Sequence, residues 1–462
     1  MQKEKMLEVQ ILPFVRDFIK KISEGLLVSN PNYCLTNRQE LWLSFCLTGI
    51  LLTNTVCWAR FERGSYGNWL LPALSWMFRK SKINWELLLK TSIEVILEKY
   101  NIKEGTLELD DTDRERSKNA KQLYKLGKHK DKKSGGYFNG QGILFVLLVT
   151  EKVSIPVGFK FYQMDPELRA WRKEEKRLKK KGVKKVHRPN EPTRNPEYPT
   201  MNQLGLILVE EFKSYFPKIR IKGVKADALF GTSEFIDGVA NIYPKIQIIS
   251  QIRHNQKIRV QGKIYHASTY FNSRAAIESK LIIRGGKEEK IYYSSVIAKV
   301  ESQGKKRLII ALKYEGETTY RYIIAKDMTW RVKDVLECFT LRWLVEVFFQ
   351  DWKMYEGWGQ LTKHVGKEGS RRSLILSLLF DHCLLSHPTQ TARIENNLPA
   401  YTVGSLRDKL SIESLLQVFK YILEHPNPKE QLEELMKNIE EVYVLRPSSK
   451  HMSGRKVNWG KA

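Results

Sequence analysis

Cysteine is scarce in this 462-residue chain, and its positions form no recognisable pattern. Five is an odd number, and no two cysteines have zinc-ligand spacing, so the sequence predicts neither a disulfide framework nor a cysteine-bound metal. We expect buried thiols in a protein of the reducing cytoplasm. The five residues are Cys34, Cys46, Cys57, Cys338 and Cys383.

Several other signatures are also missing. The chain has no phosphate-binding glycine loop and no dinucleotide-binding glycine pattern, so nothing indicates the use of ATP or NAD. The first residues lack the layout of a signal peptide. Residues 41–59 form one apolar stretch of nearly membrane-spanning length, but Ser44, Thr48 and Asn54 interrupt it. We expect a buried helix and no membrane partner; the alternative is an integral membrane protein.

Acidic residues are few compared with basic ones. The chain has 78 Lys and Arg against 51 Asp and Glu, a net charge of +27, which predicts a polyanionic partner. Aromatic residues are interleaved with the basic ones, and this favours nucleic acid over a membrane surface because bases can stack. Charge alone does not indicate an enzyme, since simple chromatin binders are also basic.

The hydrophobic pattern changes along the chain. Residues 1–100 have the 3.6-residue period of helices, which predicts a helical N-terminal domain. We expect this domain to bind DNA. Strand patterns and helical patterns then follow one another, which predicts an α/β fold with a mixed sheet and flanking helices. The expected strands are 105–112, 142–149, 154–162, 218–226 and 246–253, and the expected helices are 201–216 and 232–240.

The later part of the chain divides into three segments. Residues 257–325 are rich in strand patterns and predict a β-rich insertion. Two helices are expected at 338–353 and 371–385, followed by a helical region with a basic tail. The predicted units are 1–100, 101–256, 257–325, 326–385 and 386–462.

Two basic segments are candidates for contact with DNA. Residues 169–194 hold twelve Lys or Arg and three acids, and we expect a flexible segment that contacts the DNA backbone; the alternative is a solvated loop. Lys128, His129 and Lys130 lie in an expected basic loop, for which DNA and solvent are equally good interpretations.

The expected helix 338–353 carries charges along one face. At 100° per residue, four side chains fall within about 60° of one another. They are Phe339, Arg342, Glu346 and Lys353. The core-facing side then consists of Leu341, Leu344 and Phe348. The simplest interpretation is a solvated ion pair between Arg342 and Glu346 at i, i+4.

Acidic residues also follow two of the expected strands, at Asp110 or Asp111 and at Asp227. Three carboxylates on separate elements can converge, as two-metal phosphoryl transfer requires, because Mg²⁺ prefers oxygen ligands. The alternative is that these aspartates cap turns or helices.

The order and spacing of these residues resemble those of a known family. Phe339-x2-Arg342-x3-Glu346-x6-Lys353 resembles the Y-x2-R-x3-E-x6-K signature of DDE transposases in the insertion-sequence-four family. LDDT (109–112) and KADALFG (225–231) resemble the segments with the first and second aspartates, and QIRHNQKI (251–258) resembles the segment that follows.

The resemblance implies an RNase H-like catalytic core, interrupted by the β-rich insertion before the last catalytic helix. It implies cut-and-paste transposition by a homodimer that binds the terminal inverted repeats of an insertion sequence. One strand is nicked, the second is cut through a hairpin, and the ends are joined to target DNA. Two Mg²⁺ ions, replaceable by Mn²⁺, serve the reaction in a bacterial or archaeal cytoplasm, near the nucleoid.

The resemblance also implies roles for individual residues. Asp110, Asp227 and Glu346 would be the catalytic metal ligands, while Arg342 and Lys353 would hold DNA phosphates. Arg253 follows a strand near this site and is a further candidate phosphate ligand. Phe339 stands where the signature has tyrosine, so the hydroxyl that would bind a phosphate is absent.

The first aspartate has two candidates. The family pattern Asp-x-Thr selects Asp110, whereas strand alternation places Asp111 on the face of Leu107 and Leu109, which favours Asp111. We choose Asp110 and keep Asp111 as the alternative. The leading hypothesis for the whole chain is a Mg²⁺-dependent transposase. The alternatives are a non-catalytic DNA-binding protein derived from one and an unrelated metal-dependent nuclease.

Overall fold

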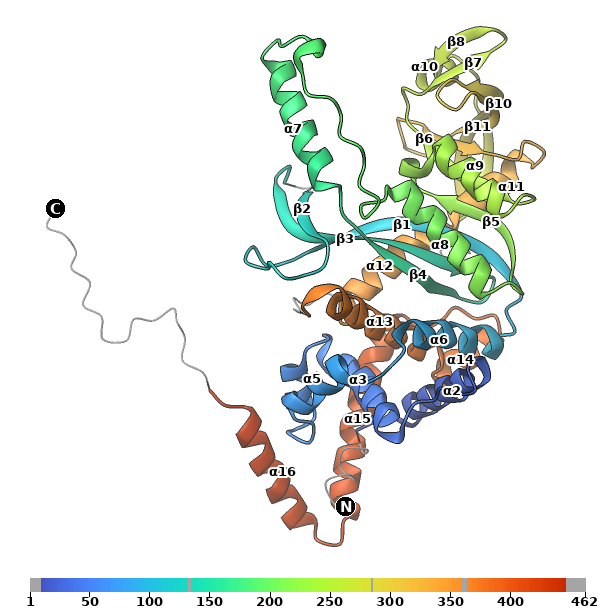
Figure 1. Cartoon of the computed structure of the whole chain (residues 1–462). Helices are drawn as coiled ribbons and strands as arrows, with labels where there is room; N and C mark the ends of the chain where they lie inside the picture. Colours follow the sequence, from blue (N-terminus) through green and yellow to red (C-terminus); the bar gives the residue numbers. More distant parts are fainter. Residues whose placement is uncertain (1–9, 132–133, 284–285, 359–363, 446–462) are drawn as a thin grey trace, which may run out of the picture.

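A computed structural model describes residues 10–131, 134–283, 286–358 and 364–445. The fold is mixed α/β, with one large mixed sheet and many helices (Figure 1). Twelve strands of the described chain form the sheet in the order β2-β3-β1-β5-β6-β12-β11-β10-β7-β8, with β4 paired to β3 and β9 to β10. The α/β class predicted from the sequence is confirmed.

The described part of the first hundred residues is helical, as predicted. The helices are α2 (Pro13–Ser29), α3 (Asn37–Thr53), α4 (Trp58–Gly64), α5 (Leu71–Lys80) and α6 (Trp85–Lys99). Helix α3 begins at a capping box, in which Thr36 and Gln39 satisfy each other's backbone N–H groups. Most of its side chains are buried, so the apolar stretch 41–59 forms protein core. Within the described residues no single helix meets the length and hydropathy of a membrane span; α3 and α4 do so only as a pair bent by 86°.

The centre of the sheet is built from both antiparallel and parallel strands. Strands β4, β3 and β1 are antiparallel neighbours, whereas β5 and β6 run parallel to β1. The helices α8 and α9 precede and follow β5, as the sequence predicted. The bounds are β1 (Glu104–Glu115), β2 (Leu126–Lys130), β3 (Tyr137–Val149), β4 (Ser154–Tyr162), α8 (Met201–Tyr215), β5 (Arg220–Ala226), α9 (Ser233–Ile242) and β6 (Gln247–Ile252).

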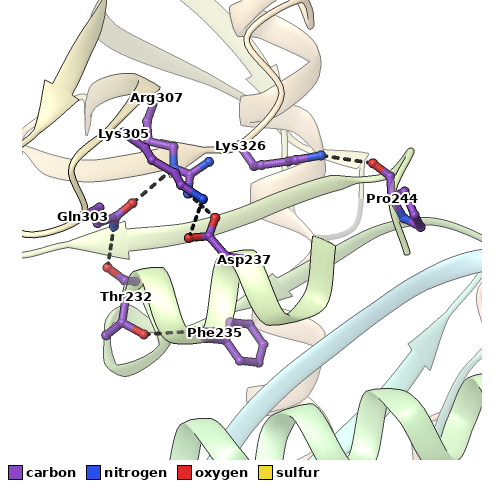
Figure 2. A network of polar contacts seen from close by, with 9 residues as sticks. Thr232, Phe235, Asp237, Pro244, Gln303, Lys305, Arg307 and Lys326 are labelled. Atoms are coloured by element: carbon purple, nitrogen blue, oxygen red, sulfur yellow. Dashed lines mark hydrogen bonds and ion pairs between the residues drawn. The ribbon is translucent and has the colours of Figure 1, made fainter. Parts of the chain in front are cut away.

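The β-rich segment 257–325 continues this same sheet, because β12 pairs with β6, with Ala325 opposite Ile249. Its elements are β7 (Lys257–Val260), β8 (Lys263–His266), α10 (Ala267–Asn272), β9 (Ile277–Ile282), β10 (Glu288–Val300), β11 (Lys305–Tyr314) and β12 (Arg321–Ala325). Figure 2 shows polar contacts between the first residues of β11 and α9. Asp237 lies 2.7 Å from Arg307 and 3.0 Å from Lys305.

The expected single helix 338–353 is two helices, α11 (Val332–Thr340) and α12 (Trp343–Tyr355). The chain between them closes in short turns, such as the bond from Arg342 N to the Phe339 carbonyl at 3.1 Å. The break lets the two helices bury their apolar faces in different clusters. Leu341, expected in the core, lies at the break and is 40% exposed, whereas Phe348 is buried.

Helix α13 (Gly366–Leu385) lies between the N-terminal helices and the sheet (Figure 1). Its buried His382 places Nδ1 2.9 Å from Ser92 Oγ in α6 and Nε2 3.0 Å from the Pro156 carbonyl in β4. Buried side chains of the N-terminal helices share one continuous apolar cluster with part of the sheet. The last described helices are α14 (Pro388–Glu395), α15 (Val403–Glu424) and α16 (Pro428–Val442).

Three further expectations need correction. The basic segment expected to be flexible forms α7 (Pro166–Lys180), followed by a short turn at Lys185–His187. Lys128, His129 and Lys130 lie in strand β2 and not in a loop. Of the five cysteines only Cys46 and Cys383 are buried, while Cys34 is exposed because it lies between helices. The basic tail at 446–462 lies outside the described residues.

Candidate functional site

Two of the candidate aspartates come from neighbouring parallel strands. Asp110 lies in β1 and Asp227 directly follows β5. Because Leu109 pairs with Ala226, the next residue of each strand reaches the same level of the sheet. The Asp227 carbonyl accepts a hydrogen bond of 2.8 Å from Ser250 in β6. The register of three strands therefore holds both aspartates at one level.

The loop after Asp227 depends on a close backbone approach. A Cβ atom on Gly231 would lie only 2.0 Å from the carbonyl oxygen of Gln251, so no other residue fits there without a shift. Gln303 donates a 3.0 Å hydrogen bond to the Gly231 carbonyl, from the network shown in Figure 2. The β-rich segment thus supports the loop that carries Asp227.

Asp110 and Asp111 point to opposite faces of β1. Asp110 is buried and faces α12, since Arg342 binds it there. Asp111 lines a separate hollow with Asp113 and Met201, on the side of α8. The alternation that placed Asp111 with the core leucines is therefore correct. It does not identify the site, because helices cover both faces of this strand.

Arg342 connects Asp110 with Glu346. Its Nη1 lies 2.9 Å from Asp110 Oδ2, and its Nη2 lies 2.7 Å from Glu346 Oε1. The Arg342 and Asp110 side chains are largely buried, whereas Glu346 is about half exposed. Arg342 lies at the break between α11 and α12, and from there its guanidinium reaches both acids. Residues that are 236 positions apart in sequence thus come together.

The charge around Asp110 is not fully compensated. Burial is the main cause that raises the pKa of Asp110 to about 7; Arg342 opposes this, while Asp227 and Asp111 add to it. Asp110 therefore lies within electrostatic reach of both Asp227 and Asp111. A buried carboxyl with two acidic neighbours holds its proton more tightly, and a bound cation would relieve this.

Phe339, at the tyrosine position of the signature, is buried in the wall of a pocket. Asp227, Arg342 and Glu346 line the same pocket. The ring also belongs to the apolar cluster between α11 and the sheet. The ring of Phe339 therefore packs in the apolar core, a role that phenylalanine can fill as well as tyrosine.

Lys353 and Arg253 lie further from the acids. Lys353 Nζ donates to Thr112 Oγ1 and, at 3.1 Å, to the Asp113 carbonyl, so it is anchored along β1 beyond Asp110. Burial, with a smaller contribution from Arg114, lowers the pKa of Lys353. Arg253 is exposed and lies one residue past the end of β6. The structure therefore brings Asp110, Asp227, Glu346 and Arg342 together, with Lys353 and Arg253 at the periphery.

Sequence reasoning missed a buried ion pair next to this site. Lys225 in β5 pairs with Glu108 in β1, and both side chains are almost fully buried. Lys225 also donates a 3.0 Å hydrogen bond to the Cys338 carbonyl in α11. The available signal was a lysine two residues before Asp227 and a glutamate two residues before Asp110, each with an apolar residue on both sides in its strand.

The candidate metal ligands are Asp110, Asp227 and Glu346. Within the described parts of the chain, no three His, Cys, Asp or Glu side chains are arranged to hold a metal ion. Arg342 lies between two of the three candidate ligands and would have to release one of them. The donor set nevertheless fits Mg²⁺, since it consists of carboxylate oxygens that carry excess negative charge.

The sequence was compared with protein families and with curated proteins. No protein-family model matches the sequence, and no curated protein is significantly similar to it.

Proposed function

We propose that this chain is a Mg²⁺-dependent DDE transposase that performs cut-and-paste transposition of an insertion sequence. The main supporting observation is that Arg342 joins Asp110 to Glu346, at the level of the sheet that Asp227 also reaches. Three acids expected to act together, from segments far apart in the sequence, thus approach one another. A chance set of three acids in a chain with 51 acidic residues has no reason to do so.

The sheet supports the finer proposal of an RNase H-like core. Strands β4, β3 and β1 are antiparallel, and β5 and β6 continue parallel to β1. Asp110 lies within the central strand β1, and Asp227 directly follows β5. The β-rich segment enters after β6, and the chain then returns with the helix that carries Glu346. This is the order expected of such a core with an insertion before its last catalytic helix.

In this proposal Asp110, Asp227 and Glu346 hold two Mg²⁺ ions, which Mn²⁺ can replace. When bound, the ions supply charge stabilisation to the attacking and leaving oxygens of a phosphodiester. Arg342 would exchange a carboxylate for a DNA phosphate, which its planar guanidinium also binds in a bidentate manner. Lys353 and Arg253 would hold phosphates on either side.

The net charge of +27 supports double-stranded DNA as the partner. We propose that two copies bind the terminal inverted repeats and nick one strand with water. The freed 3′-hydroxyl then attacks the second strand, which releases the flanking DNA and closes the end into a hairpin. Water opens the hairpin, and the restored 3′-hydroxyls attack target DNA.

The decisive experiment compares wild type with Glu346→Gln on a duplex that contains the repeat flanking the gene. This substitution keeps the shape of the side chain and removes its charge. We expect wild type to nick at the repeat boundary with Mg²⁺ or Mn²⁺, and the variant to bind equally well without cutting. A duplex with a scrambled repeat is the matched substrate control.

A second candidate, a non-catalytic DNA-binding protein derived from a transposase, is favoured by one observation. Arg342 already pairs with both Asp110 and Glu346 and so offsets part of their charge, as it would in a site without metal. If wild type and Glu346→Gln both bind DNA and neither cuts it with either metal, this second candidate replaces the first. Cutting without any joining of ends would instead indicate a nuclease.

A further inference from the structure

A basic arm stands out from the sheet next to the candidate site. The arm comprises residues 165–199, that is, α7 and the segment that returns to α8. Figure 1 shows α7 rising beside β2, away from the other helices. Fifteen helical residues span about 22 Å, roughly two-thirds of a turn of duplex DNA.

The arm is held together by its own contacts. At its base Asp165 caps α7 through Glu167 N at 3.0 Å and accepts a 2.9 Å hydrogen bond from Asn195 N on the returning segment. Further out, Trp171 donates through Nε1 to the Pro189 carbonyl at 2.8 Å. The helix and the return are therefore tied together at two levels, and the arm needs no ligand to be ordered.

The surface of the arm carries a large excess of positive charge. Two of the three acids between residues 169 and 194 are already paired, Glu174 with Arg177 and Glu175 with Arg188. Four lysines of α7 point into solvent within two turns of helix. They are Lys173, Lys176, Lys179 and Lys180. Positive charges this close together repel one another, and a bound polyanion would offset this repulsion.

The base of the arm lies beside β1, on the face of this strand opposite to Asp110. Arg172 and Arg194 line one hollow together with Asp111 and Asp113, which follow Asp110 in β1. Arg169 donates at 3.3 Å to the Lys128 carbonyl in β2, where Lys128 itself is exposed. Basic residues thus extend from β1, starting one residue away from Asp110 in the chain, along β2 and α7.

We propose that this arm binds the phosphate backbone of the DNA duplex whose reacting phosphate lies at Asp110, Asp227 and Glu346. The inference rests on the proposed function and adds the direction in which the DNA leaves the site. Backbone contact is favoured over base stacking, because the Trp171 indole is half-buried and bound to Pro189. The arm therefore contributes affinity and orientation, not sequence recognition.

The test neutralises the four exposed lysines of α7 in the full-length chain, as Lys173→Gln, Lys176→Gln, Lys179→Gln and Lys180→Gln combined. Glutamine has a helix propensity close to that of lysine, so α7 is expected to remain folded. The matched control changes four exposed lysines on helices at the other end of the molecule (Figure 1), which alters the net charge equally. These are Lys409, Lys420, Lys429 and Lys437.

Binding of a 30-base-pair DNA duplex is measured over a range of salt concentrations. We expect the arm variant to bind at least about 10-fold more weakly than wild type near 0.1 M salt. The slope of log K against log salt should fall by about 0.9 for each phosphate that the arm no longer neutralises. The control should stay within about 2-fold of wild type.

Equal affinity and equal salt slopes for the arm variant and the control would overturn the inference. So would tighter binding of a 30-base-pair RNA duplex than of DNA, with the arm lysines responsible for it. Failure of the proposed function is a different result, since wild type would then not cut although the arm variant still loses affinity. If wild type cuts and the arm variant both binds and cuts normally, only the arm inference fails.

Discussion

Asp110 and Asp111 are neighbours in the chain but lie in different surroundings. Asp110 faces Arg342 and Glu346, whereas Asp111 lines the hollow beside the arm. At the scale of the residue, this difference has a direct consequence for activity. A metal ligand and a residue that only approaches DNA should respond very differently to loss of charge.

We predict that Asp110→Asn lowers the rate of strand cleavage by about 100-fold or more, as expected when a group that stabilises charge in the transition state is lost. Asp111→Asn should lower it by less than about 10-fold. Single-turnover cleavage of the repeat duplex measures both variants under the same conditions. The opposite order would identify Asp111 as the catalytic residue.

The buried pair Lys225–Glu108 also acts at the scale of single residues. Lys225→Met would leave Glu108 buried without its cation, so we predict a loss of about 3–5 kcal/mol in the free energy of unfolding. The double variant Lys225→Met, Glu108→Leu should recover most of this loss, because no charge then remains buried. Urea denaturation followed by circular dichroism measures both. A single variant that loses less than about 1 kcal/mol would contradict the prediction.

At the scale of elements, the break between α11 and α12 decides what the signature residues contact. Phe339 lies before the break and packs against the sheet, while Glu346 lies after it and lines the pocket. A continuous helix would have placed Leu341 in the core, yet this residue is exposed. The broken helix lets one short segment contribute both to the wall of the pocket and to its charges.

The arm allows a prediction at the same scale. Asp165→Ala removes a helix cap and the bond to the returning segment, so we predict a local loss of about 1–2 kcal/mol in the stability of the arm. Trypsin should cleave between residues 172 and 194 several-fold faster than in wild type, while the melting temperature of the whole protein changes by less than about 2 °C. Glu167→Ala, on the same helix, is the control and should leave the cleavage rate unchanged.

At the scale of the whole molecule, the helices after Glu346 connect the sheet to the N-terminal part. Glu356, at the end of α12, is fully buried, and Asp381 in α13 lies next to it. Burial, reinforced by Asp381 and Asp351, raises the pKa of Glu356 well above its usual range. Burial raises the pKa of Asp381 to about 7, with Asp351 adding to the effect and Glu356 opposing it.

These raised values predict how global stability depends on pH. The folded protein keeps the Asp381 proton between about pH 4 and pH 7, whereas the unfolded chain releases it. The stability that this group contributes is therefore complete below about pH 4 and is lost as the pH rises to about 7. We predict that Asp381→Asn gains stability relative to wild type between pH 5 and pH 8, on the order of 2–4 kcal/mol. Urea denaturation at the two pH values measures this, and an unchanged difference would contradict it.

Much of the architecture was predictable from local patterns. Six elements lie close to their predicted positions: β1, β3, β5, β6, α8 and α13. Their hydrophobic residues recur at the spacing that burial on one or both faces requires, so the pattern is visible in the sequence. The order of the three candidate acids, Asp110, Asp227 and Glu346, is given directly by the sequence. The helix α7 was missed because its charge suggested a flexible segment, although its Lys, Arg, Glu and Leu residues favour helix.

The sequence by itself determined the fold class, the excess of positive charge and the candidate residues. Burial periodicity, composition and spacing are properties of the chain that need no knowledge of distant contacts. Only the tertiary structure shows that Asp110, and not Asp111, shares the Arg342 guanidinium with Glu346. It also places Lys225 against Glu108. Strand register and helix packing set these distances between residues more than a hundred positions apart, and no local pattern contains that information.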